Sequence, residues 1–115
     1  MEIGVDIEQN DRFKNLSKHF LERVYTENEL SYAQKFKNVH EHLCAMWCVK
    51  EATVKAFSNL KIPFLQIELS ATLDGKPFIV RNDTINKELK KLGFSEIKVS
   101  LSHSKDYSTA TCIIY

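Results

Sequence analysis

The chain has 115 residues, a length that fits one domain and excludes a multidomain machine or a large barrel. Its 16 lysine and arginine residues against 15 aspartate and glutamate residues give a net charge of +1, which argues against a nucleic-acid-binding protein. No apolar stretch approaches the roughly 20 residues that span a bilayer. Three cysteines without a paired framework fit a reducing compartment, so we expect a cytoplasmic protein that does not enter membranes.

The first half of the chain contains one predicted strand and three predicted helices. Ile3, Val5 and Ile7 alternate with glycine or acidic residues, which is the period of a strand with one apolar face. Thr26 followed by Glu29 is a capping box, in which each side chain accepts a hydrogen bond from the other residue's backbone N–H. The predicted elements are a strand over 1–8 and helices over about 10–24, 26–36 and 39–60.

Strands dominate the second half. Asp74-Gly75 predicts a hairpin turn between strands over 66–73 and 76–80. Asn82 or Asp83 begins a helix that Gly93 ends, and two strands follow over 97–101 and 109–115. Because helices gather early and strands late, we predict an α+β fold in one domain, residues 1–115. A mostly antiparallel sheet packs against helices, with one long central helix.

The first group of chemical interest is Asp6 and Glu8. Two residues apart on a strand, their side chains leave the same face. Neighbouring like charges repel each other unless water or a cation lies between them. A solvent-facing edge of the sheet and a metal site therefore explain this pair equally well.

The second group lies on the long helix, which is apolar nearly all round from Leu43 to Ala56 and should be buried. Its charges are Lys50, Glu51 and Lys55, of which Glu51 and Lys55 share a face. A surface ion pair of little consequence is one explanation. The other is that Glu51 joins the strand carboxylates at a magnesium ion, while Lys55 neutralises phosphate charge.

The third group is Ser102-His103-Ser104 at the end of a strand. A histidine flanked by hydroxyl groups can hold a phosphate, although a single histidine in a loop is more often only solvated. Ser102 is a poor candidate for a nucleophile with His103 as its base, because adjacent strand residues face opposite ways and no glycines surround it.

In this order along the chain, the three groups resemble one family, the 4'-phosphopantetheinyl transferases. The resemblance rests on Gly4–Asp6, on the K-E-A-x-x-K-A element of Lys50–Ala56 and on Ser102-His103, and it extends over nearly the whole chain. The length is similar to that of the short, holo-(acyl-carrier-protein) synthase type. That type acts as a homotrimer with active sites between subunits, although the sequence leaves a dimer open.

The resemblance implies a reaction. Phosphopantetheine is transferred from coenzyme A to a serine hydroxyl of an acyl carrier protein, with release of adenosine 3',5'-bisphosphate. Whether that carrier serves fatty-acid or secondary-metabolite synthesis stays open. Two rival classes are a non-catalytic α+β interaction module and another magnesium-dependent phosphoryl-transfer or hydrolytic enzyme.

The resemblance also implies residue roles. Asp6 and Glu51 match the ligands of Mg²⁺, and Glu8 matches a third ligand found in the family's longer type. Glu51 and Lys55 are the catalytic candidates; the base is either Glu51 or a water on the metal. The residues implied to contact coenzyme A are Lys50, Lys55, Pro77, Ser102 and His103.

The expected carrier is acidic, and the first predicted helix offers it basic residues. Arg12, Lys14 and Lys18 are interleaved with the apolar face of that helix. In short-type relatives the corresponding helix receives the carrier. Taken alone, these residues are better explained as an ordinary solvated face.

Overall fold

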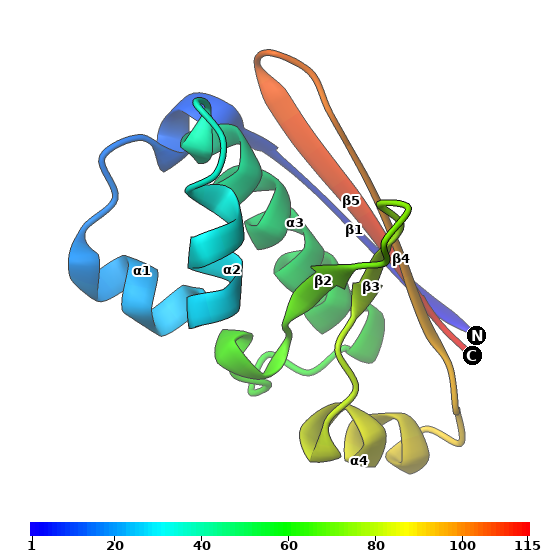
Figure 1. Cartoon of the computed structure of the whole chain (residues 1–115). Coiled ribbons are helices and arrows are strands. Elements are labelled where there is room, and N and C mark those ends of the chain that lie inside the picture. The colour runs from blue at the N-terminus through cyan, green and yellow to red at the C-terminus, as the bar shows by residue number, and fades with distance from the viewer.

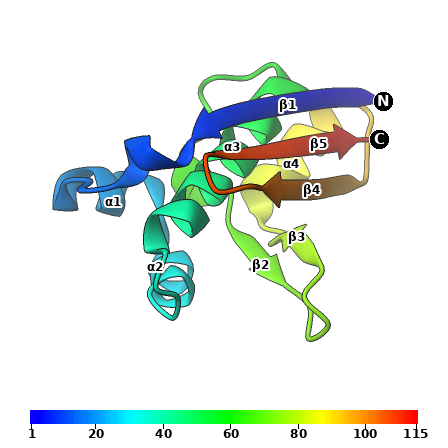
Figure 2. The ribbon, with the colours of Figure 1, turned by 90° about the horizontal axis from the view of Figure 1, so that it is seen from above.

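The computed structural model describes residues 1–115, and its central feature is a three-stranded antiparallel sheet. The strands are β1 (Glu2–Gln9), β4 (Ile97–His103) and β5 (Tyr107–Ile114), in the order β1-β5-β4. β5 therefore lies in the middle and β1 forms an edge (Figure 2). The predicted α+β class with an antiparallel sheet is confirmed.

One long helix, α3 (Val39–Phe57), crosses a single face of this sheet. Two short helices, α1 (Lys18–Val24) and α2 (Glu27–Ala33), lie on the same side, so the opposite face of the sheet has no helix over it (Figures 1 and 2). The predicted central helix is thus present and buried on most of its surface. None of the helices combines the length and apolar composition needed to cross a membrane.

The remaining elements are a hairpin beyond β4 and a helix on the same side of the sheet as α3. The short strands β2 (Leu69–Ala71) and β3 (Pro77–Ile79) form the predicted hairpin, and Figure 2 shows it on the side away from β1. Helix α4 (Asp83–Lys91) begins after Asn82, whose side chain accepts the N–H of Ile85. Gly93 follows α4 with the left-handed backbone (φ 77°) expected at a helix end.

Two predicted elements differ most from the structure, and other ends shift by a few residues; the long helix expected to residue 60, for example, ends at Phe57. The helix expected over 10–24 is a 3-10 turn, η1 (Asn10–Phe13), followed after a break by α1, because Asn15 takes a left-handed backbone (φ 60°) and Ser17 caps a new helix. The strand expected over 66–73 is replaced at its start by a second 3-10 turn, η2 (Phe64–Gln66). Apolar spacing continues across both breaks and therefore does not reveal them.

Strand β1 has the predicted alternation of apolar and polar residues, but the polar face, and not the apolar one, meets the core. Its glycine and acidic residues point toward α3, whereas its apolar residues point away from it. Ile3, Val5 and Ile7 are 63%, 56% and 61% exposed. The sheet thus turns carboxylates inward and leaves an uncovered apolar surface outside.

Gly4 explains how a strand can lie directly on a helix here. A Cβ atom at Gly4 would stand 1.9 Å from the backbone oxygen of Ala52 and 2.7 Å from the backbone nitrogen of Ala56. Both obstacles are backbone atoms of α3, which cannot rotate away as a side chain can. Only glycine therefore allows β1 to approach α3 this closely, and the alanines on the helix complete the contact.

We expect Gly4→Ala to push β1 away from α3 and to lower the free energy of unfolding by about 3 kcal/mol or more. Gly75→Ala is the matched control, since Gly75 has a left-handed backbone (φ 87°) but open space around it. Backbone strain alone should cost about 1 kcal/mol there. Urea unfolding of the two variants measures both losses in the free energy of unfolding. Equal losses in Gly4→Ala and Gly75→Ala would show that the close approach at Gly4 is unimportant.

Candidate functional site

The close contact of β1 with α3 brings Asp6 beside Lys55. Lys55 Nζ lies 3.1 Å from Asp6 Oδ1 and 2.9 Å from the backbone oxygen of Val5. The Asp6 side chain is almost fully buried, while that of Lys55 is half-exposed. The other carboxylate oxygen, Asp6 Oδ2, is buried and receives no hydrogen bond. One side of this carboxylate is therefore satisfied and the other is available for a ligand.

Glu51 completes the charged group from one turn earlier on α3. Burial raises the pKa of Glu51 above its usual value, and the negative charge of Asp6 raises it further. The positive charge of Lys55 lowers the pKa of Glu51, and the negative charge of Glu8 raises it by a smaller amount. The two carboxylates from the start and the middle of the chain therefore share one electrostatic environment, as the sequence predicts.

Glu8 is paired with a residue outside this group. Its Oε2 lies 3.3 Å from Arg12 Nη1, in an ion pair with η1. No group of three His, Cys, Asp or Glu side chains is placed to hold a metal ion. In the metal-free chain Glu8 is thus paired with Arg12, although its charge still acts on the pKa of Glu51. Its role as a third ligand stays a prediction.

The pair of Asp6 and Glu51 does fit a magnesium ion. A buried carboxylate oxygen without a donor is costly, and a cation would satisfy it. Magnesium commonly takes one or two carboxylates and completes its shell with phosphate and water oxygens. The hard oxygen donors, the buried Asp6 oxygen and the neighbouring Lys55 together suit a bound cation and a phosphate.

The expectation that Lys50 contacts coenzyme A is wrong. Its side chain is fully buried on the other side of α3 and pairs with Glu29 at 2.9 Å. Its Nζ also donates to the backbone oxygens of Phe64 and Ile67. All three donors of the ammonium group are thereby used inside the protein, so none is free for a phosphate.

The residues implied for the nucleotide end lie apart from this carboxylate pair. Ser102 faces the uncovered side of the sheet, whereas His103 faces the helices and has Nδ1 3.8 Å from Glu41 Oε1. From residue 41 to residue 51 the helix rises about 15 Å. Pro77 is on the hairpin beyond β4 (Figure 2). A single chain therefore separates the two halves of the expected site.

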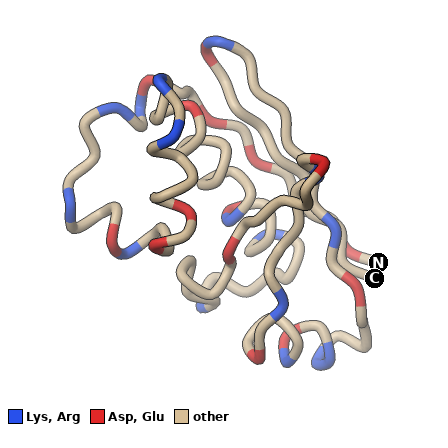
Figure 3. Tube along the Cα trace, in the orientation of Figure 1, with Lys and Arg blue, Asp and Glu red and all other residues tan.

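The basic residues of the predicted carrier surface are each matched by a nearby acid. Arg12 pairs with Glu8, Lys14 lies 3.1 Å from Asp11, and Lys18 lies 3.7 Å from Glu22. Along residues 8–22 the basic positions are flanked by acidic ones on either side (Figure 3). Exposed pairs of this kind contribute little and exchange partners easily.

A hollow of about 450 Å³ lies against α1. Its wall is aromatic: Trp47 stacks on Phe20 at 5.6 Å and meets Phe64 edge-on at 5.0 Å between ring centroids. The complete lining is Ser17, His19, Phe20, Arg23, Val24, Trp47 and Phe64. The sequence indicates only core roles for these aromatic residues; nothing in their spacing reveals that three of them border a hollow beside basic side chains.

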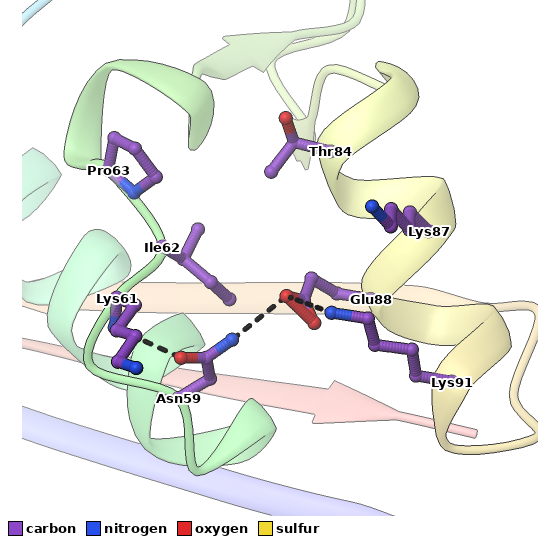
Figure 4. A pocket seen from close by; sticks show the side chains of 8 residues that line it. All are labelled: Asn59, Lys61, Ile62, Pro63, Thr84, Lys87, Glu88 and Lys91. Atoms are coloured by element: carbon purple, nitrogen blue, oxygen red, sulfur yellow. Dashed lines mark hydrogen bonds and ion pairs between the residues drawn. The ribbon is translucent and has the colours of Figure 1, made fainter.

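A second hollow lies between α4 and the segment after α3 (Figure 4). Lys61, Lys87 and Lys91 line it, but the Glu88 carboxylate is among them. Glu88 Oε1 accepts from Asn59 Nδ2 at 2.8 Å and lies 3.4 Å from Lys91 Nζ. These contacts compensate part of the positive charge, and the hollow is separate from the Asp6 and Glu51 carboxylates.

Comparison with known families identifies the class of protein. Residues 2–112 match the model of the 4'-phosphopantetheinyl transferase superfamily. The chain therefore belongs to this family of enzymes, and the alternative of a non-catalytic interaction module is not supported.

The individual relatives within this family are named as holo-[acyl-carrier-protein] synthases. A protein of Leptospira biflexa named holo-[acyl-carrier-protein] synthase is 35% identical over 123 residues, which cover 100% of this chain and 96% of that protein. The crystal structure of the synthase of that name from Neisseria meningitidis has a TM-score of 0.88 and 25% identity, covering 99% of this chain and 97% of the other. The Bacillus anthracis enzyme, solved in complex with CoA (3',5'-ADP), has a TM-score of 0.81 and 28% identity, with 98% and 94% covered.

We expect Glu51→Gln to stabilise the chain at neutral pH. Folding raises the pKa of Glu51, so the folded state favours its protonated form and loses stability as pH rises through that pKa. Glutamine cannot ionise and avoids this loss. The Tm of Glu51→Gln should exceed that of the unmodified chain by on the order of 2 °C at pH 7.

The difference should vanish below about pH 4, where glutamate is protonated in both states. Thermal unfolding followed by circular dichroism across this pH range measures it. A variant that is less stable than the unmodified chain at pH 7 would contradict the electrostatic description of the site.

Proposed function

We propose that this chain is a holo-(acyl-carrier-protein) synthase, which transfers 4'-phosphopantetheine from coenzyme A to a serine of an acyl carrier protein. The observation that carries the proposal is the meeting of Asp6, Glu51 and Lys55 in a chain of this family. The match over residues 2–112 supports one transferase domain over 1–115. We also propose that the enzyme works in the cytoplasm, a reducing compartment in which its three free cysteines would persist.

The reaction joins the oxygen of the carrier serine to the phosphorus that bears pantetheine. The bond from this phosphorus to the bridging oxygen breaks, and adenosine 3',5'-bisphosphate leaves with that oxygen and its electron pair. The serine proton passes to a base. Negative charge grows on the leaving phosphate, so the site must offer positive charge there.

Lys55 supplies part of that charge. Its half-exposed ammonium group is held by Asp6 and by the backbone of Val5, so it is oriented before the substrate arrives. Asp6 and Glu51 would hold a magnesium ion, which supplies charge neutralisation and orientation for the diphosphate when bound. Lys55 would thus bind the diphosphate directly, while the carboxylates would bind it through the metal ion.

Glu51 is the group of this chain best suited to accept the serine proton. In the metal-free chain burial raises the pKa of Glu51, which favours proton uptake there; a water held by the magnesium ion is the alternative base. Asp6 is committed on one side to Lys55, so it serves the transfer by binding and orientation rather than by taking up the proton.

The experiment incubates the chain with coenzyme A and an apo acyl carrier protein and measures the carrier by mass spectrometry. We expect the carrier to gain the mass of one phosphopantetheine group with magnesium, and no gain after chelation. Asp6→Asn and Glu51→Gln should lower the rate by at least about 100-fold. Breakdown of coenzyme A without transfer would instead favour a hydrolytic enzyme.

We also propose that the enzyme is a homotrimer with sites between subunits. The carboxylates lie at the β1 edge, whereas His103 and Pro77 lie toward β4 and its neighbouring hairpin. If one subunit supplies the first set and its neighbour the second, each contact joins unlike surfaces. Contacts of this kind close into rings when the rotation allows it.

The uncovered face of the sheet supports the same assembly. Ile3, Val5 and Ile7 form a row of exposed apolar side chains, and Ile113 lies beside Ile3 on β5. Apolar surface of this kind usually marks a protein interface. Subunit contact over this face would bury the row and place the Ser102 side of β4 near a neighbour.

Mixed subunits test the shared site. Glu51→Gln and His103→Ala should each be nearly inactive alone, since each damages a different half of every site. When the two variants are unfolded together and refolded as mixed trimers, some sites receive both intact halves. We expect up to about one quarter of the normal activity to return. No recovery, with trimers confirmed by light scattering, would place both halves in one subunit.

The carrier is proposed to dock over η1 and α1, as the sequence indicates for Arg12, Lys14 and Lys18. Their weak ion pairs can be exchanged for contacts with acidic carrier residues. The aromatic hollow beside α1 adds an apolar anchor point, and Arg23 at its rim has no acidic partner within the chain. Charge would guide encounter, while the hollow would hold the carrier.

A further inference from the structure

Lys50 and Glu29 form a charge pair that the transfer chemistry does not use. Both side chains are fully buried, and Lys50 Nζ lies 2.9 Å from Glu29 Oε1. The same Nζ donates to the backbone oxygens of Phe64 at 2.9 Å and Ile67 at 2.6 Å. An ammonium group has three donors, and all of them are occupied.

The partner carboxylate is also fully engaged. Glu29 Oε1 accepts the backbone N–H of Thr26, which completes the capping box of α2, and Oε2 accepts the backbone N–H of Leu69 at the start of β2. The pair therefore joins α3, the beginning of α2 and the segment 64–69. A buried ion pair rarely adds net stability over an apolar pair of similar volume, which is compatible with a positioning role.

The segment that this pair fixes carries one wall of the hollow beside α1. Phe64 lines the hollow, and its ring lies 5.0 Å from that of Trp47 at an angle of 77°. No other side chain of α3 hydrogen-bonds to residues 64–67; Asn82 and Thr84 bond Gln66 from the α4 side. Lys50 is thus the only α3 side chain that hydrogen-bonds to the backbone of Phe64.

We propose that Lys50 is a positioning residue for carrier recognition, which holds the Phe64 backbone so that the Phe64 ring and Trp47 shape the hollow that receives the carrier. The inference rests on the proposed function and on docking beside α1. It gives neighbouring residues of one helix turn different tasks: Glu51 faces the diphosphate, while Lys50 faces the protein interior and sets the carrier surface.

The test compares steady-state kinetics of Lys50→Met, Phe64→Ala and the double variant, with an apo acyl carrier protein and coenzyme A varied in turn. Lys50→Met and Phe64→Ala should each raise KM for the carrier about tenfold and leave KM for coenzyme A unchanged. Because Lys50 acts through Phe64, the double variant should be no worse than Phe64→Ala. A multiplied effect in the double variant, or a parallel rise in KM for coenzyme A, would overturn the inference.

Thr53→Val is the matched control, since Thr53 is a buried polar residue of the same helix whose hydroxyl donates to the Val49 oxygen and forms no hydrogen bond with residues 64–67. It should leave both KM values unchanged, so that loss of a buried polar group alone is not mistaken for positioning. Arg23→Glu should raise KM for the carrier through the rim of the hollow. An unchanged KM in Arg23→Glu would show that the docking surface itself is misplaced.

A second measurement uses the unmodified chain and does not depend on whether Lys50→Met folds. Hydrogen exchange of residues 64–67 should slow when the apo carrier is added, because the carrier covers this segment. Unchanged exchange, with the carrier bound, would overturn the inference. If the unmodified chain transfers no phosphopantetheine to any carrier, the proposed function fails instead, and the two failures remain distinguishable.

Discussion

The structure depends on the close approach of one edge strand to the central helix. Gly4 permits it, because any side chain there would meet backbone atoms of Ala52 and Ala56. Two residues further along the strand, the same approach sets Asp6 against Lys55, within the electrostatic reach of Glu51. The glycine of the N-terminal motif thus serves the chemistry indirectly, by allowing the acidic residue beside it to reach the helix.

The charged helix turn around Glu51 serves two environments at once. On one side, carboxylates and Lys55 create a polar site with an unsatisfied Asp6 oxygen, which suits a cation and a diphosphate. On the other side, Lys50 is satisfied entirely by the protein. Consecutive residues on a helix point about 100° apart, so a single turn can join a catalytic surface to an interior support.

Much of this arrangement follows from local sequence patterns. The order of elements, the capping box of Thr26 and the pairing of Asp6 with the helix all come from period, spacing and motif. The break at Asn15 does not, since apolar spacing runs through it. Nor does the direction in which β1 faces, because alternation defines two faces without saying which meets the core. The burial of Lys50 depends on Glu29, a contact between distant segments that no short motif contains.

The uncovered apolar row on β1 has a consequence for the life of each newly made chain. In the proposed homotrimer a neighbour would cover Ile3, Val5 and Ile7, whereas a single chain exposes them on an edge strand, which favours aggregation. Survival would then depend on how quickly subunits meet, and apparent thermal stability would rise with protein concentration. If transfer needs the shared sites of the proposed homotrimer, strong dilution would lower the activity before any helix unfolds, and the concentration of the chain would then control carrier activation.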